Sequence, residues 1–127
     1  MKETGKAGIQ GHIERFLMLE EAEGRVVYIK NNTGAVRTIR KDGSKGFMRF
    51  GKKGSPDFLI WKNHSELLEM PDCSRVRISH VRTYFVEVKT EIGVQSDAQR
   101  EFQAKVENIR GEYFIVRNLN ELKKILL

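Results

Sequence analysis

Apolar residues recur at steps of three and four positions in three stretches of the chain, and this spacing predicts three amphipathic helices. The first covers residues 9–23 and is followed by a glycine. The second begins at Ser96, which forms a capping-box pattern with Gln99 three positions later. The third begins at Asn118, which stands in the same relation to Glu121.

Short stretches rich in β-branched and aromatic residues predict strands between these helices. The clearest are RVVYIK at 25–30, FLIW at 58–61, TYFVEVK at 83–89 and EYFIV at 112–116. Two weaker candidates are FMRF at 47–50 and RVRISHV at 75–81. Residues 62–74 predict a short helical turn and a loop.

The order of these elements is helix, several strands, helix, strand, helix, which predicts an α/β fold with a mixed central β-sheet flanked by helices. A chain of 127 residues has the usual size of one domain, so we expect residues 1–127 to form a single domain. Residues 62–82 lengthen the path between two predicted strands, and we interpret them as an insertion or an extended hairpin.

Two acids and a lysine occupy unusual positions beside these strands. Asp57 follows Gly-Ser-Pro and directly precedes FLIW, while Glu87 and Lys89 interrupt an otherwise apolar strand. Because side chains alternate along a strand, Glu87 and Lys89 face the same side, about 6 to 7 Å apart. If FLIW pairs with the strand at 83–89, Asp57 can reach the same place.

Two carboxylates beside an ammonium group suit a hard divalent cation, Mg²⁺ or Mn²⁺. Such an ion lowers the pKa of a bound water and neutralises charge that develops on a phosphate, which is the chemistry of phosphodiester hydrolysis. Each motif also has a simpler interpretation, since acids after proline are common in turns and Glu-x-Lys is a common cross-strand pair. Their occurrence together favours the catalytic interpretation.

Positive charge is concentrated in one segment of the chain. The formal net charge is +6, yet residues 30–53 alone carry eight bases and one acid. A basic segment near a candidate metal site favours contact with DNA phosphates, although charge runs are also common in solvated loops. The predicted DNA-binding residues are Lys30, Arg37, Arg40, Lys41, Lys45, Arg49, Lys52 and Lys53.

The stretches GSPDFLIW, VEVKT, SDAQREF and NNTGAV together resemble the VRR-NUC family, a branch of the PD-(D/E)xK nucleases, and GEYFIVRNLNEL resembles that family's closing strand and helix. The resemblance implies a restriction-endonuclease-like core. It also implies that Asp57, Glu87 and the Val88 carbonyl bind the metal and that Lys89 is the catalytic lysine. Gln99 matches a helix glutamine that supports the site, although the capping box with Ser96 would use the same residue.

The family has a glutamate in its first helix, where this chain has Lys6 and Gly8 in KAGIQGHIERF. Glu14, one turn after Gln10, is the candidate replacement, with a solvated surface role as the alternative. The resemblance implies a structure-selective DNA endonuclease that cuts branched DNA such as Holliday junctions as a homodimer. A nickase, a flap-type repair nuclease and a catalytically decayed nucleic-acid-binding module are the alternatives.

Several expectations concern what the sequence lacks. Its one cysteine, Cys73, and the lack of a secretory leader favour a cytoplasmic protein, and no apolar run approaches the length of a membrane span. No Walker or Gly-x-Ser-x-Gly motif is present, so we expect no nucleotide cofactor. Together with Cys73, His12, His64 and His80 lack the spacing of a zinc site.

Overall fold

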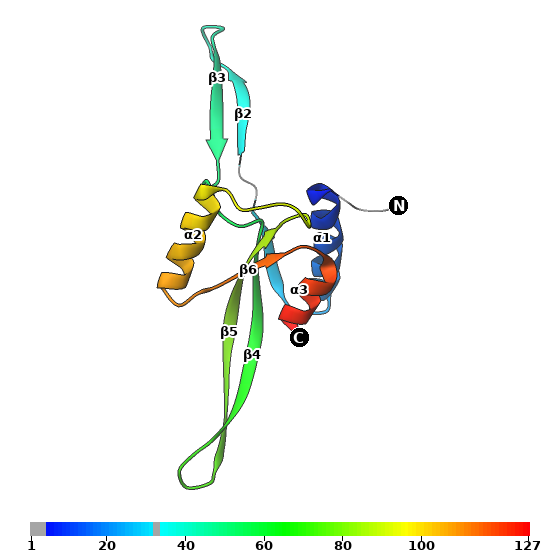
Figure 1. Cartoon of the computed structure of the whole chain (residues 1–127), viewed down its shortest axis with the longest axis vertical. Helices are drawn as coiled ribbons and strands as arrows, with labels where there is room; N and C mark the ends of the chain where they lie inside the picture. The colour runs from blue at the N-terminus through cyan, green and yellow to red at the C-terminus, as the bar shows by residue number, and fades with distance from the viewer. Residues whose placement is uncertain (1–4, 32–33) are drawn as a thin grey trace.

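The computed structural model describes residues 5–31 and 34–127, in which strands form a four-stranded central sheet and a separate two-stranded hairpin (Figure 1). The elements in chain order are α1 (Lys6–Ala22), β1 (Val27–Lys30), β2 (Gly34–Ile39), β3 (Lys45–Phe50), β4 (Phe58–Glu69), β5 (Arg75–Val88), α2 (Asp97–Asn108), β6 (Glu112–Val116) and α3 (Leu119–Leu126).

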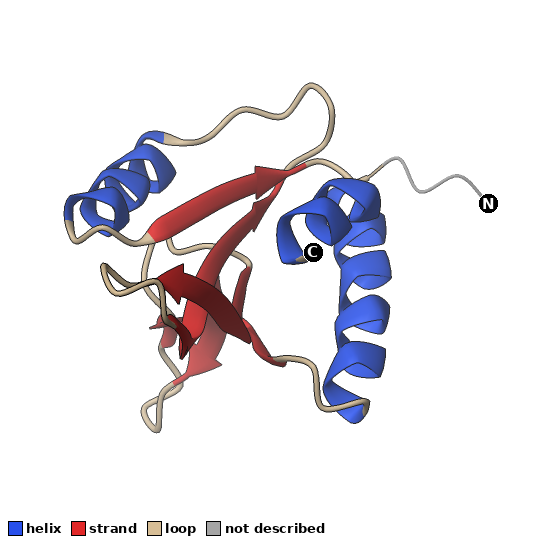
Figure 2. Cartoon of the chain, turned by 90° about the horizontal axis from the view of Figure 1, so that it is seen from below, coloured by secondary structure: helices blue, strands red, loops and turns tan. Residues whose placement is uncertain are grey.

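The central sheet is mixed and has the strand order β1-β4-β5-β6. β4 pairs antiparallel with β1 and β5, whereas β5 pairs parallel with β6. Helix α2 forms the crossover connection between β5 and β6. Helices α1 and α3 cover one face of this sheet and α2 covers the other (Figure 2). The predicted α/β class with a mixed sheet between helices is therefore confirmed at this level.

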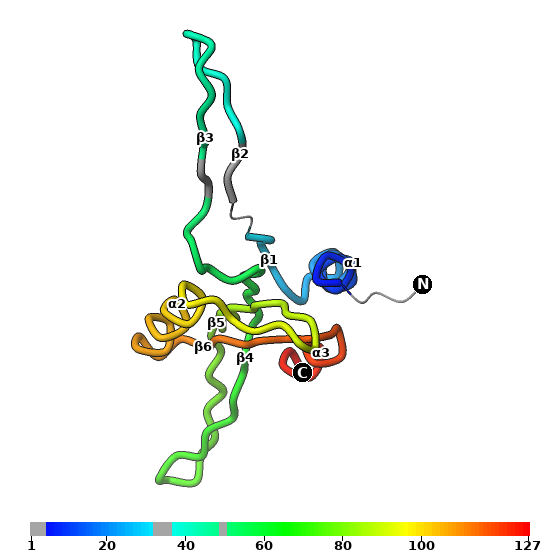
Figure 3. Tube along the Cα trace, turned by 45° about the horizontal axis from the view of Figure 1, so that its top comes forward, coloured from blue at the N-terminus to red at the C-terminus, as the bar shows by residue number. Residues whose placement is uncertain are grey.

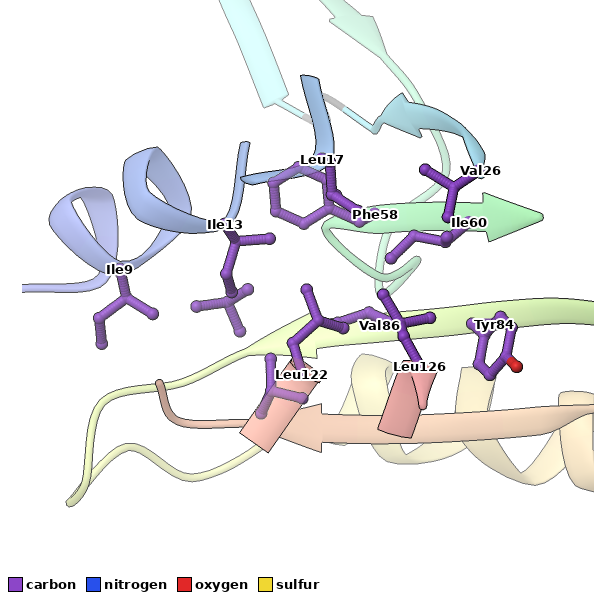
Figure 4. Packing of buried hydrophobic residues seen from close by; sticks show 12 residues of the cluster. Ile9, Ile13, Leu17, Val26, Phe58, Ile60, Tyr84, Val86, Leu122 and Leu126 are labelled. Carbon is purple, nitrogen blue, oxygen red and sulfur yellow. The ribbon is translucent and has the colours of Figure 1, made fainter. Parts of the chain in front are cut away.

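The main core lies between the central sheet and the α1/α3 layer, where apolar side chains converge from both sides (Figure 4). Ile13 and Leu17 of α1 are fully buried against Phe58, Ile60 and Val86. Burial of side chains of this size contributes about 1.5 to 3 kcal/mol each. The strand that carries Glu87 is therefore fixed by the core on its opposite face.

The predicted helices all form, with small differences at their ends. α1 begins at Lys6 rather than near residue 9, and its N-cap residue, Gly5, has no side chain that could mark the start in the sequence. The capping box of Ser96 and Gln99 is present, and the Asn118 side chain accepts a hydrogen bond from the Glu121 N–H, as predicted. No helix in the described ranges is long and apolar enough to cross a membrane.

The helical turn predicted within residues 62–74 is wrong, whereas the predicted loop is present at residues 70–74. β4 continues to Glu69 and pairs without interruption with β5, so residues 62–82 form the outer part of an extended hairpin. Most side chains of this outer part are exposed on both faces. Neither face of the hairpin packs against a core there, which explains why apolar and polar residues alternate only weakly in its sequence.

A second hairpin, β2–β3, extends from the opposite end of the molecule (Figures 1 and 3). We call it the basic arm, residues 34–50. Strand β3 contains the predicted FMRF, whereas β2 was not predicted. The tips of both hairpins have the same construction: an Asp side chain accepts the N–H of a Ser two positions on, and the residue between them has positive φ. That residue is Gly43 in the basic arm and Cys73 in the β4–β5 hairpin.

Candidate active site

Asp57 and Glu87 lie side by side because their strands pair. The register matches Phe58 with Val86, which places Asp57, directly before the start of β4, opposite Glu87 near the end of β5. The turn before Asp57 is held by Asn31, whose Nδ2 donates to the Pro56 carbonyl at 3.0 Å and whose N–H donates to the Asp57 carbonyl at 2.7 Å. Asp57 Oδ2 accepts the Val88 N–H at 2.7 Å, so its carboxylate is oriented by the neighbouring strand.

Glu87 is the one charged residue among the fully buried side chains of the described ranges. Its Oε1 accepts a hydrogen bond from Gln99 Nε2 at 2.8 Å, and Tyr113 Oη donates to its Oε2 at 3.5 Å. A carboxylate removed from water is costly unless such partners surround it. Glu87 is therefore held in one orientation by α2 and β6, on the side of the sheet opposite the main core.

Two lysines complete the cluster. Lys6 Nζ lies 3.2 Å from Asp57 Oδ2 and 3.2 Å from Glu87 Oε1, so one ammonium group bridges both carboxylates. Lys89 Nζ lies 3.8 Å from Glu87 Oε1. The structure thus brings together Asp57, Glu87 and Lys89, as the alternation of the strand indicated, and adds a second cation from the first residue of α1.

Burial and charge act on Glu87 in the same direction. Burial, and secondarily the negative charge of Asp57, raises the pKa of Glu87 from 4.5 to about 7, against an opposing effect of Lys6. For Lys6, burial lowers the pKa, but the Asp57 and Glu87 carboxylates together raise it above its ordinary value. Burial, followed by the Glu87 charge, also raises the pKa of Tyr113. The two carboxylates therefore repel each other and attract a cation between them.

Gln99 serves the helix cap and the carboxylate at the same time. Its Oε1 accepts the Ser96 N–H at 2.9 Å in the capping box, while its Nε2 donates to Glu87. An amide side chain can do both because it carries an acceptor and two donors. The two interpretations of Gln99 in the sequence are therefore compatible.

Close packing of α2 against the turn before β4 fixes the position of Gln99. Gly54 has a φ of +85°, and a Cβ at this position would lie 2.3 Å from the Ala98 carbonyl oxygen. Such a contact is not tolerated, so only glycine permits the approach. The Gly-Ser-Pro-Asp turn thus positions Asp57 and the start of α2 together.

Glu14 is placed elsewhere. It lies eight residues after Lys6 in α1, about 12 Å along the helix axis, and its Oε2 pairs with Lys30 Nζ at 3.4 Å. The first-helix residue that reaches Asp57 and Glu87 is Lys6, which the sequence analysis considered only as a departure from the family pattern. Ile9, one turn later, is buried in the core, so the helical period could have indicated that Lys6 follows the same face.

Three of the predicted DNA-binding residues make contacts within the protein. Lys30 pairs with Glu14, Arg40 Nη1 donates to the Lys45 carbonyl at 3.0 Å within the basic arm, and Lys52 Nζ lies 5.9 Å from the centre of the Phe102 ring. The side chain of Arg49 lies outside the described residues. All seven members whose side chains are described are exposed, and those three are joined in this by Arg37, Lys41, Lys45 and Lys53.

The histidines differ from the expectation in one respect. His64 and His80 are cross-strand partners in the β4–β5 hairpin, with ring centres 5.3 Å apart, and His64 Nε2 lies 3.2 Å from Glu66 Oε1. Sequence spacing alone does not show this pairing because it depends on the hairpin register. Across the described residues, no group of three or more His, Cys, Asp or Glu side chains is arranged to hold a metal ion.

Comparison of the chain with models of known protein families, with curated proteins and with solved structures finds no match. The resemblance to VRR-NUC nucleases stays a prediction from the sequence motifs.

Proposed function

We propose that the protein is a metal-dependent DNA endonuclease with a restriction-endonuclease-like core. The observation that carries the proposal is the convergence of Asp57, Glu87 and Lys89 at the paired ends of β4 and β5. One carboxylate of this group is fully buried, which a stable fold tolerates poorly without a functional or compensating partner. Perturbed carboxylates of this kind are characteristic of catalytic sites.

The residues fit a hard divalent cation, Mg²⁺ or Mn²⁺. The space between Asp57 and Glu87 is already a cation position, since the Lys6 ammonium lies at 3.2 Å from both carboxylates. Asp57 and Glu87 would hold the ion, with the Val88 carbonyl as the third protein ligand by the resemblance. When bound, the ion would supply an activated water and neutralise charge on the phosphate.

The protein residues have distinct roles in this proposal. Lys89, close to Glu87 and with a largely buried side chain, orients the attacking water towards phosphorus. The water oxygen forms a bond to phosphorus and loses a proton, while the bond to the 3′ oxygen breaks and that oxygen gains a proton. Gln99 and Tyr113 hold the Glu87 carboxylate in place. The products carry 5′-phosphate and 3′-hydroxyl ends.

The basic arm supplies a surface for the DNA backbone. Four exposed bases, Arg37, Arg40, Lys41 and Lys45, lie in the described part of this hairpin, which projects away from the central sheet (Figure 3). Contacts of this kind are with phosphates and are sensitive to salt but largely blind to sequence. By the resemblance, the substrate is branched DNA such as a four-way junction, and the active form is a homodimer. A nickase or flap-type activity would use the same site.

A second function is favoured by one specific observation. Because Lys6 fills the position between the carboxylates, the same residues could form a permanent ion-pair cluster in a catalytically decayed nucleic-acid-binding module. Such a protein would bind DNA through the basic arm without cutting it. The two functions differ in cleavage and not in binding.

A panel of labelled substrates separates these functions. Duplex, flap, bubble and four-way-junction DNA are incubated with the protein and Mg²⁺, Mn²⁺ or EDTA. We expect metal-dependent cleavage of a branched substrate, its loss in Asp57→Asn and Lys89→Ala, and retained binding in both variants. Asp97→Asn, which changes a highly exposed acid in α2, is the matched control and should cut normally.

The decisive outcome is the behaviour of the folded wild-type protein. If it cuts none of the substrates with either metal, the nuclease proposal is wrong. Binding without cleavage would support the second function.

A further inference from the structure

Lys6 occupies the place that a metal ion would take. It lies in the first turn of α1, is separated by 81 residues from Glu87, and contacts both acids of the site. We propose that the Lys6 ammonium is an internal competitor for the divalent cation, so that metal binding requires Lys6 to leave the carboxylates. This inference rests on the proposed function for its choice of metal and deepens the account of the same site.

Charge balance explains why both cations do not bind together. When both are ionised, Asp57 and Glu87 provide two negative charges, and Lys6 and Lys89 provide two positive charges within 4 Å of them. A divalent ion added to this neutral cluster would leave an excess of +2 in a mostly buried site. Departure of Lys6 reduces that excess and removes its ammonium from Asp57 Oδ2 and Glu87 Oε1, which keep their hydrogen bonds from the Val88 N–H and Gln99 Nε2.

Lys6 is the cation that can leave. Its side chain is 37% exposed, whereas that of Lys89 is 13% exposed. A lysine has a flexible four-carbon stem, so rotation about its side-chain bonds moves the ammonium into solvent without movement of the helix. Lys89 instead follows β5 directly, and its N–H donates to the Val116 carbonyl at 3.0 Å.

The remaining site is prepared to stay in place when Lys6 departs. Glu87 keeps its hydrogen bonds from Gln99 and Tyr113, and Asp57 keeps the Val88 N–H. The carboxylates therefore need no new orientation to accept another cation. The cost of metal binding is the loss of the Lys6 ion pairs, which lowers the apparent affinity by the fraction of molecules in which Lys6 is released.

The test measures Mn²⁺ binding directly, without DNA. Mn²⁺ is titrated into the full chain and followed by electron paramagnetic resonance of the free ion and by calorimetry, for wild type, Lys6→Met and Lys6→Gln. Lys124→Met, which removes one exposed lysine of α3, controls for the change in net charge. The double variant Lys6→Met with Asp57→Asn reports whether the ion binds at this site.

We expect both Lys6 variants to bind Mn²⁺ about tenfold more tightly than wild type, which corresponds to Lys6 being released in roughly one molecule in ten. Lys124→Met should match wild type, and the double variant should lose the tight site. Without metal, Lys6→Met should melt at a lower temperature than wild type, and saturating Mn²⁺ should raise its melting temperature by more than it raises that of wild type.

Equal Mn²⁺ affinity of folded Lys6→Met, Lys6→Gln and wild type would overturn the inference, as would no Mn²⁺ binding by either Lys6 variant. The nuclease proposal fails separately: tighter Mn²⁺ binding without cleavage of any DNA retains the competition by Lys6 and rejects the nuclease. Metal-dependent cleavage with unchanged Mn²⁺ affinity does the reverse.

Discussion

Replacement of Glu87 by glutamine measures how much the buried charge destabilises the fold. Glu87→Gln keeps the shape of the side chain and an acceptor for Gln99 but removes the charge. The folded pKa of Glu87 is raised from 4.5 to about 7, so the folded protein holds this proton more tightly than the unfolded chain. The contribution of Glu87 to stability is therefore greatest below pH 4.5 and is lost as pH rises through 7, by at most roughly 3 kcal/mol.

The Lys6 pKa, which is also raised, does not alter this window. Its contribution is fully present below its ordinary pKa of 10.5 and is lost only above the raised folded value. We therefore expect the stability difference between Glu87→Gln and wild type to grow between pH 5 and pH 8, in favour of the variant. Urea unfolding followed by circular dichroism, in EDTA at several pH values, gives this difference directly.

A variant of Glu112, whose pKa is shifted in the opposite direction, is the control. A hydrogen bond from Arg82 lowers the pKa of Glu112, so its stabilising contribution is present above pH 4.5 and is lost on acidification. Glu112→Gln should therefore destabilise the protein at neutral pH and have less effect at low pH. A difference between Glu87→Gln and wild type that is constant from pH 5 to pH 8 would refute the reasoning about Glu87.

Three further predictions concern the support of the site and the basic arm. Gly54→Ala should lower the free energy of unfolding by more than 2 kcal/mol, because the new Cβ is strained by the positive φ and also collides with Ala98. Gly43→Ala is the control: its φ is also positive, but no atom lies near the new Cβ, so the same denaturation assay should show a loss of about 1 kcal/mol. Arg117→Ala should speed hydrogen exchange in residues 90–95, because Arg117 Nη1 donates to the Glu91 carbonyl at 3.2 Å and to the Gly93 carbonyl at 2.9 Å; unchanged exchange would contradict this role. Replacement of Arg37, Lys41 and Lys45 by glutamine should reduce the slope of log binding constant against log salt by about 3, and an unchanged slope would show that these residues do not touch phosphates.

Local patterns were sufficient to predict the helices and the central strands. The caps at Ser96 and Asn118 are formed by neighbouring residues, so their signal is contained in a few positions. Alternation in the strand at 83–89 predicted that Glu87 and Lys89 share one side, and in the structure Val86 and Val88 on the other side belong to the core. Helical spacing alone does not mark the end of α2, since Ile109, three positions after the buried Val106, is its C-cap and is mostly exposed.

The hairpins were predicted less well because their sequences do not face a core. The signal that could have found them is in their turns, where KDGS and PDCS share an Asp and a Ser two positions apart. In both turns the Asp side chain accepts the Ser N–H, and the residue between takes positive φ. Cysteine is an unusual residue for that conformation, which hid the second turn.

The site was predictable where it depends on adjacent strands and not where it depends on distant packing. Asp57, Glu87 and Lys89 follow from one strand pairing. Lys6 reaches the site only because α1 packs across the sheet, so its partner is far away in the chain. The candidate Glu14 was chosen for its chemical type, and the position of its helix against the sheet directs it to Lys30 instead.

The two hairpins that extend from opposite ends of the central sheet affect how the size of the protein in solution can be measured (Figure 1). A compact domain of this length has a radius of gyration of about 14 Å, and two projecting hairpins give this protein a larger one. The monomer should therefore diffuse more slowly than a compact protein of equal mass and elute ahead of it from a gel-filtration column. Light scattering or sedimentation equilibrium, which report mass independently of shape, are the measurements by which the proposed homodimer should be judged.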